Sequence, residues 1–110
     1  MIKKIAELLS AKNIILENVR VVNLADFTRS KTLFALVGTD GHGYNNLFFL
    51  RVAKGKILSK DARNLAQISG QISQNLDIKI RKITLFYCCE ICSKSIKFFK
   101  ENSWKLYDFV

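Results

Sequence analysis

The 110-residue sequence has no proline, one histidine and one tryptophan, and only half as many acidic as basic residues. No apolar stretch approaches the roughly 18 residues that a membrane-spanning helix requires. The amino terminus begins with two lysines, but polar residues interrupt its apolar run before that run reaches the length of a secretion signal. No linker, low-complexity segment or internal repeat marks a domain boundary. We therefore expect a single domain over residues 1–110 in a soluble, cytoplasmic protein with no membrane partner.

Positive charge is what the chain has in excess. It carries 18 Lys and Arg against 9 Asp and Glu, for a formal net charge of +9. Residues 51–82 contain eight basic and two acidic residues, so this third of the chain carries +6 of the +9. A concentrated positive field favours a polyanionic partner, nucleic acid before an anionic membrane surface. The alternative is a solvated basic surface without such a partner.

Hydrophobic patterning predicts a mixed α/β fold. A short amphipathic stripe predicts a helix within residues 1–13. Two β-prone runs predict strands at 19–22 and 33–37, separated by a turn at 26–31. The Asp40-Gly41 pair predicts a hairpin that leads into a third strand at 47–54. Because this third strand is almost uncharged, we expect it to be buried on both faces.

The second half of the chain alternates helix and strand. Apolar residues at helical spacing predict a helix up to Leu76, with Ser59 as its N-cap. A strand at 78–87, a lysine- and phenylalanine-rich helix and an optional final strand at 105–109 follow. The expected order is therefore α-β-β-β-α-β-α, which forms a three-layer domain whose mixed central sheet is flanked by helices.

The stretch from Leu33 to Phe109 resembles the restriction-endonuclease-like (PD-(D/E)XK) fold, closest to Mrr-type and related Holliday-junction nucleases. The resemblance rests on the strand that ends in Lys54, the turn at 55–59, the glutamine-bearing helix and the strand at 83–87. It implies an acid on the second strand and an acid-x-lysine on the third, which hold Mg²⁺ and activate water. It aligns Lys54 with the family lysine and Val52 with the family acid, and residues 32–35 offer no carboxylate. The resemblance thus implies a degenerate site without metal or cofactor.

Two other function classes stay open. A Mg²⁺-dependent endonuclease would need Asp40 or Asp26, in a different register, together with Lys54. A structural or protein-interaction subunit, in a homodimer or with another chain, is favoured by the aromatic residues near the carboxyl end, although such aromatics are more often core. These aromatics are Phe98, Trp104, Tyr107 and Phe109.

Binding of nucleic acid, DNA first, is the function that the charge pattern favours. Lysine and arginine would neutralise phosphates and glutamine amides would contact the backbone, so the affinity should fall steeply with salt. The alternative for the glutamines is a solvated helix face. The predicted binding residues are Arg51, Lys54, Lys56, Lys60, Arg63, Gln67, Arg81 and Lys82.

Three cysteines cluster between a strand and a helix. Cys89-x-x-Cys92 resembles the redox motif of thioredoxins, but that fold places the motif near its first strand and faces it with a proline that this chain lacks. A zinc site would need Cys88 and Cys89 to share one ion with the distant His42. Structural thiols in a reducing compartment are the third and favoured interpretation.

Overall fold

The computed structural model describes residues 2–28, 32–53 and 55–108, without the side chains of residues 2, 3 and 26. The predicted order of elements is confirmed, including the short final strand. One 3₁₀ turn, η1, is additional. The elements are α1 (Ile2–Ala11), β1 (Glu17–Val22), η1 (Leu24–Asp26), β2 (Leu33–Thr39), β3 (Asn45–Arg51), α2 (Ser59–Leu76), β4 (Ile80–Tyr87), α3 (Ser93–Glu101) and β5 (Lys105–Asp108).

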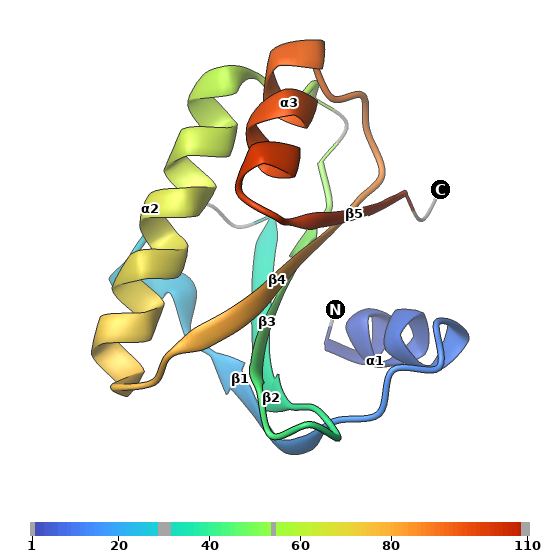
Figure 1. Cartoon of the computed structure of the whole chain (residues 1–110). Helices are drawn as coiled ribbons and strands as arrows, with labels where there is room; N and C mark the ends of the chain where they lie inside the picture. The colour runs from blue at the N-terminus through green and yellow to red at the C-terminus, as the bar shows by residue number, and fades with distance from the viewer. Residues whose placement is uncertain (1, 29–31, 54, 109–110) are drawn as a thin grey trace.

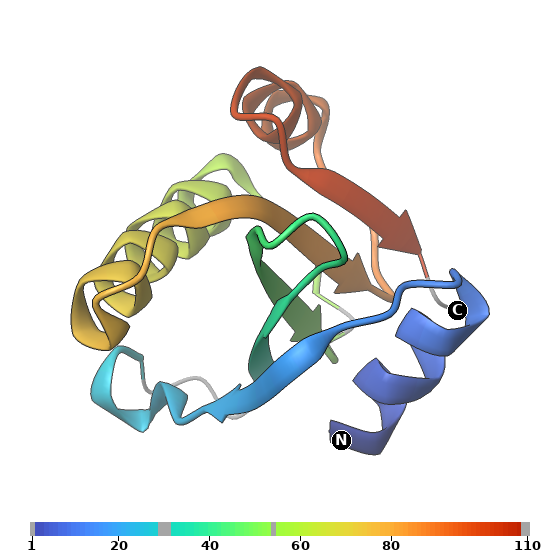
Figure 2. The same cartoon turned by 60° about the horizontal axis from the view of Figure 1, so that its bottom comes forward.

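The five strands form one mixed sheet in sequence order, β1-β2-β3-β4-β5. The pairs β1/β2 and β2/β3 are antiparallel, and the pairs β3/β4 and β4/β5 are parallel. Helices α2 and α3 cover one face and α1 covers the other (Figures 1 and 2). This is the predicted three-layer arrangement.

Strand β3 is the centre of the core. Leu47 and Phe49 face α2 and α3, whereas Phe48 and Leu50 face α1, and all four are buried. Alternate side chains of a strand point to opposite faces, so one uninterrupted apolar run supplies both halves of the core. The prediction that this strand is covered on both faces is confirmed.

Helix α2 has a different N-cap from the one predicted. Leu58, not Ser59, is the N-cap, with an extended backbone, and its N–H donates to Oδ2 of Asp61 at 2.9 Å. The acidic side chain therefore reaches back to the cap, and a Ser side chain is not needed there. At the other end Asp77 has φ 52°, and Ile78 N–H donates to Ser73 O at 3.1 Å. This turn delays β4, which starts two residues later than predicted.

The predicted hairpin after β2 is present, with Thr39 paired to Asn45. Trp104 packs against Phe49 and Phe99, with ring centroids 5.8 and 4.9 Å apart, so it belongs to the core. Lys54, Phe109 and residues 29–31 of the predicted turn lie outside the described residues. In the part of the chain that is described, no helix is long and apolar enough to cross a membrane.

Candidate nucleic-acid interface

An irregularity in the pairing of β4 with β3 directs two cations to the β2–β3 hairpin. Asn45 pairs with Ile80 but Asn46 pairs with Lys82, which leaves Arg81 as an extra residue. Ile80 and Ile83 consequently both pack into the core on the α2 side, although residues three apart in a regular strand would face opposite ways. Arg81 and Lys82 are both exposed and both reach the ring of Tyr44 in the hairpin.

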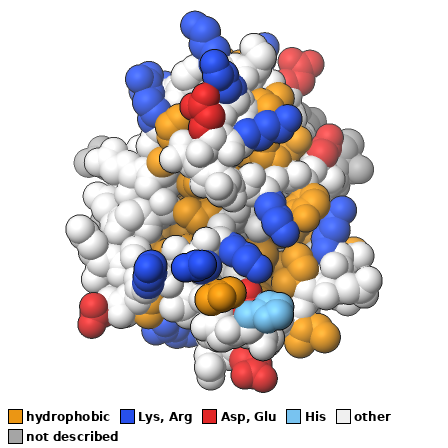
Figure 3. Space-filling model, viewed as in Figure 1, with side chains coloured by type: hydrophobic (Ala, Val, Ile, Leu, Met, Phe, Trp, Pro, Cys, Tyr) orange, Lys and Arg blue, Asp and Glu red, His pale blue; other side chains and the backbone are white. Residues whose placement is uncertain are grey.

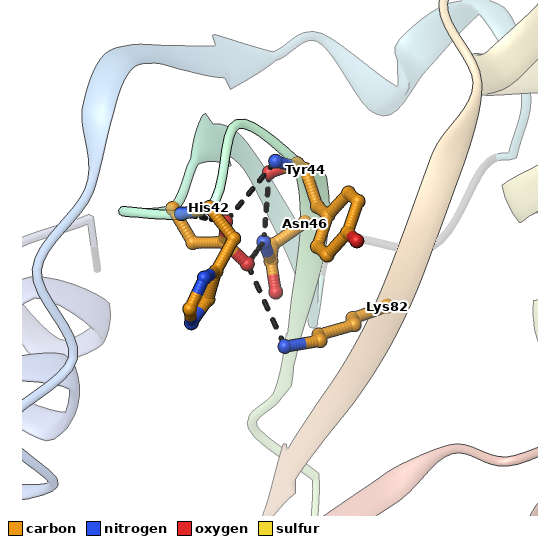
Figure 4. A network of polar contacts seen from close by, with 5 residues as sticks. His42, Tyr44, Asn46 and Lys82 are labelled. Atoms are coloured by element: carbon orange, nitrogen blue, oxygen red, sulfur yellow. Dashed lines mark hydrogen bonds and ion pairs between the residues drawn. The ribbon is translucent and has the colours of Figure 1, made fainter.

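Asp40 holds this hairpin together (Figure 4). Its Oδ1 accepts the backbone N–H groups of His42 at 2.9 Å and Tyr44 at 3.0 Å, and its Oδ2 accepts Nδ2 of Asn46 at 3.0 Å. Nζ of Lys82 lies 3.6 Å from the same Oδ2. The amide hydrogen bond from Asn46, together with the two backbone N–H groups and the Lys82 charge, lowers the pKa of Asp40 to about 2, against a smaller opposing effect of desolvation. The carboxylate is ionised and engaged with groups of its own hairpin.

Beside this network, on the α1 face of the sheet, lies a concavity of about 260 Å³ that we call the lysine groove. Three lysines from three separate elements line it: Lys12 just after α1, Lys82 on β4 and Lys105 on β5. Asp40 is the only carboxylate among the described lining residues. Nζ of Lys12 lies 4.5 Å from the centroid of the Tyr107 ring. The remaining lining residues are Ile14, Asn46, Phe48 and Thr84.

The space-filling view shows Lys and Arg side chains gathered beside the chain's one histidine, next to apolar surface (Figure 3). Lys12 and Lys105 were not among the predicted binding residues. No signal in the sequence connects them to Lys82, because their proximity depends on the strand order and on the packing of α1. Tyr44 was also missed, although an aromatic residue directly after a glycine-rich turn could have been noted as exposed.

The predicted basic surface over residues 51–82 is divided into two clusters. Lys56, Lys60 and Arg63 are exposed at the start of α2, whereas Arg81 and Lys82 lie beyond its end. A helix of 18 residues is about 27 Å long, so the two groups do not form one surface. Sequence proximity was misleading because α2 carries the chain the full length of the sheet between them.

Arg51 and Gln67 are the two other predicted binding residues that the structure describes. Arg51 is half-buried, and its Nη1 donates to Gly55 O at 2.7 Å and contacts Sγ of Cys89 at 3.1 Å. This guanidinium therefore ties the loop after β3 to the loop after β4. Gln67 is exposed on α2, one turn beyond Arg63. Lys54, as stated above, lies outside the described residues.

The position at which the resemblance puts the family's metal ligands is apolar. Val52 follows β3 and donates its N–H to Thr32 O at 2.8 Å, and it packs with Phe34 against the core on the α1 side. Asp40 lies at the opposite end of β3, about 20 Å away along a seven-residue strand. Lys54, the proposed partner of Asp40 or Asp26 in a nuclease, lies outside the described residues, and the side chain of Asp26 is not described. Among the described residues, no three His, Cys, Asp or Glu side chains are grouped to hold a metal ion.

The cysteines lie at the start of α3 and are free thiols. Cys92 is the N-cap of α3: its Sγ accepts the N–H of Ser95 at 3.4 Å and lies 3.0 Å from the Ser95 hydroxyl. The hydroxyl and then the N–H of Ser95 lower the pKa of the Cys92 thiol. Cys88 Sγ lies 3.9 Å from the carbonyl of Arg51. These contacts describe capping and packing thiols and leave the redox hypothesis untested.

No family model matches the chain, and no curated protein matches it. Solved structures of other proteins do match the chain. EndoMS in its apo form matches with a TM-score of 0.58 and 14% identity over 97% of this chain, and a repair endonuclease from Pyrococcus abyssi matches with 0.57 and 10% over 99%. An EndoMS-dsDNA2 complex matches with a TM-score of 0.53 and 13% identity over 96% of this chain.

This chain spans 45%, 46% and 42% of those three proteins, so it corresponds to less than half of each. At this level of identity the likeness concerns the fold. The chain has the restriction-endonuclease-like nuclease fold, as its sequence resemblance predicted.

Proposed function

We propose that this chain binds nucleic acid, in particular DNA, by phosphate contacts in the lysine groove, and that it does not cleave it. The observation that carries the proposal is the convergence of Lys12, Lys82 and Lys105 from three elements on one concavity with a single carboxylate. Cations that meet in a concave site focus a positive potential on the phosphate backbone and neutralise it without reading sequence.

Two further observations support the proposal. The fold is shared with a protein solved in complex with dsDNA, although at 13% identity this likeness does not transfer that protein's partner. Asp40, the only groove carboxylate among the described residues, accepts three hydrogen bonds and lies 3.6 Å from Nζ of Lys82, so its charge offsets that of one lysine and the charges of Lys12 and Lys105 remain. The groove therefore presents a net positive surface to a ligand.

The residues at the end of β3 support the absence of cleavage. Val52 would occupy the position of the fold's acid after β3, and residues 32–35, which match its acidic position on the second strand, offer no carboxylate for Mg²⁺. Without metal, activation of water for attack on a phosphodiester loses its main source of charge stabilisation. A plasmid-nicking assay with and without Mg²⁺ tests this part, and Mg²⁺-dependent nicking by the purified chain would overturn it.

Binding is tested by fluorescence anisotropy with labelled double-stranded DNA, single-stranded DNA and RNA at about 50 and about 200 mM salt. We expect micromolar or tighter binding that weakens at least tenfold at the higher salt. The Lys12→Glu/Lys105→Glu variant should weaken binding at least tenfold, since it reverses two groove charges and leaves the Asp40 network intact. Lys97→Glu/Lys100→Glu on α3 makes the same change in net charge away from the groove and is the matched control.

Equal losses in the two variants would show that only total charge matters and would overturn the groove assignment. Absence of binding to all three ligands at the lower salt would overturn nucleic-acid binding itself.

An interaction subunit is the second candidate function, and one observation favours it. Ile15, two residues before β1, is 83% exposed, and Val19 and Val21 on β1 at the edge of the sheet are 50% and 59% exposed. Exposed apolar side chains on an edge strand commonly mark a protein contact. Light scattering after size-exclusion chromatography tests this candidate. A dimer that Val19→Lys/Val21→Lys converts to a monomer would support it, and a monomeric native chain would contradict self-association.

A further inference from the structure

Tyr44 is an exposed aromatic ring on a rigid base. Its backbone N–H donates to Asp40 Oδ1 at 3.0 Å, and its carbonyl accepts Nδ2 of Asn46 at 3.0 Å and the N–H of Asp40 at 3.0 Å. The residue is nevertheless 41% exposed. Tyrosine is intermediate in burial among the residue types, and this ring is held outward by a hairpin in which Asp40 and Asn46 both bond to the Tyr44 backbone (Figure 4).

Two cations lie over the ring, and the centroid of the His42 ring is 6.2 Å from its centroid. Cζ of Arg81 lies 4.9 Å and Nζ of Lys82 lies 5.9 Å from its centroid, and both residues are there because of the irregularity in β4. The ring also borders a second concavity of about 260 Å³, whose described lining is Gly43, Tyr44, Asn45, Lys79 and Arg81, with no acidic residue. Lys82 lines the lysine groove as well, so the ring lies next to the proposed phosphate site.

An exposed ring beside cations is the combination that binds a nucleobase together with its phosphate. The base stacks on the aromatic face and the cations neutralise the backbone on either side. Inside a duplex both faces of each base are covered by its neighbours, so away from the duplex ends only an unpaired base offers a free face. We propose that Tyr44 is a stacking platform for an unpaired base, and that the ligand class of this chain is therefore single-stranded nucleic acid or a single-stranded segment. This inference rests on the proposed function.

The test separates the contribution of the bases to binding from that of the phosphates. Anisotropy is measured with a labelled single-stranded oligonucleotide and with an abasic strand of the same length, which has the same phosphates and no bases. We expect the native chain to bind the strand with bases about tenfold more tightly, as one stacked base provides. Tyr44→Ala should remove that difference and leave binding to the abasic strand unchanged. Tyr44→Phe, which keeps the ring, should retain it.

A second readout reports on the ring itself. In a Tyr44→Trp variant the new indole is exposed, whereas the native Trp104 is 8% exposed in the core. Stacking with a base should quench the exposed indole when the single strand is added, and the abasic strand or a blunt duplex of the same sequence should leave its emission unchanged. Far-ultraviolet circular dichroism and thermal melting of each variant confirm that the hairpin is folded.

The outcomes distinguish this inference from the proposed function. If the native chain binds the strands with and without bases equally, or if a blunt duplex binds as tightly as the single strand, the stacking inference is overturned and phosphate binding stands. If no strand binds, the proposed function fails and the inference fails with it. Loss of the preference for bases in Tyr44→Ala and its retention in Tyr44→Phe would support both.

Discussion

At the scale of the residue, Asp40 links the stability of the hairpin to pH. Its folded pKa of about 2 lies below the ordinary value of 3.8, because Asn46 and two backbone N–H groups donate to the ionised form. A lowered pKa contributes stability that is complete above pH 4 and lost as the pH falls through about 2. We expect Asp40→Ala to lower the melting temperature by several degrees at pH 7 and to differ little from the native chain at pH 2.

Melting curves of the two proteins between pH 2 and 7 provide the measurement. Lys82→Met is the matched variant: it removes the ion pair with Asp40 but leaves all three hydrogen bonds. At pH 7, Lys82→Met should lower the melting temperature by less than Asp40→Ala does. The reason is that the hydrogen bonds from Asn46 and the backbone lower the pKa of Asp40 more than the Lys82 charge does. If Asp40→Ala lowers the melting temperature by the same amount at pH 2 and at pH 7, the role given to the charge of Asp40 is contradicted.

Cys92 supports a second prediction at this scale. The Ser95 hydroxyl and N–H lower the pKa of its thiol, so its thiolate forms at a lower pH than in a free cysteine. We expect Cys92 to be alkylated by iodoacetamide with a rate profile whose midpoint lies below that of a free cysteine, and Ser95→Ala to move that midpoint upward. Peptide mapping by mass spectrometry, with Cys88→Ser and Cys89→Ser variants, measures it. An unchanged midpoint in Ser95→Ala would refute the role given to the Ser95 hydroxyl.

At the scale of the element, α2 shows how closely sequence pattern and packing correspond. Ile72 is fully buried against the sheet and Gln71 beside it is exposed. Removing three methyl or methylene groups at Ile72 leaves a cavity, so Ile72→Ala should lower the free energy of unfolding by about 2–5 kcal/mol. Gln71→Ala on the same turn should change it by less than about 0.5 kcal/mol. Urea denaturation followed by circular dichroism tests both, and similar effects would contradict the orientation of α2.

The same element explains what could be predicted from the sequence and what could not. Buried residues recur along α2 at helical spacing and β3 is one apolar run, so period and hydrophobicity were sufficient to predict the order of elements and the double burial of β3. Ser59 was chosen as N-cap by residue type, whereas the cap is made by the carboxylate of Asp61 reaching back to Leu58. Such a reciprocal contact depends on backbone geometry, which residue type alone does not report.

The candidate site was less predictable than the fold, and the reason lies in β4. Arg81 and Lys82 would face opposite sides of a regular strand, and one extra residue brings both to the hairpin. Nothing in the sequence marks that irregularity. Lys12 and Lys105 join Lys82 only because α1 packs beside β5 across the lysine groove, a relation that spans almost the whole chain.

At the scale of the whole molecule, the excess of basic residues is distributed over separate sites. The lysine groove lies on the α1 face, and the cluster of Lys56, Lys60 and Arg63 lies at the start of α2, whose length separates the two ends of the sheet by about 27 Å. Duplex DNA rises about 3.4 Å per base pair, so about 8 base pairs match the length of α2, and a shorter duplex held in the groove does not extend along the whole helix to the second cluster. Ligand length therefore distinguishes a ligand held by one site from a ligand held by two.

This geometry gives a prediction about salt dependence. Each phosphate contact contributes about 0.9 to the slope of log affinity against log salt for duplex DNA. Lys12→Glu/Lys105→Glu should reduce that slope by about 2 for duplexes of any length, because the lysine groove is engaged first. Lys56→Glu/Lys60→Glu should leave short duplexes unaffected and reduce the slope only once the duplex exceeds about 8 base pairs. Anisotropy titrations over a length series at four or more salt concentrations measure both slopes. If the α2 variant weakens the shortest duplex as strongly as the groove variant does, the primary contact lies at the start of α2, where the sequence first predicted it.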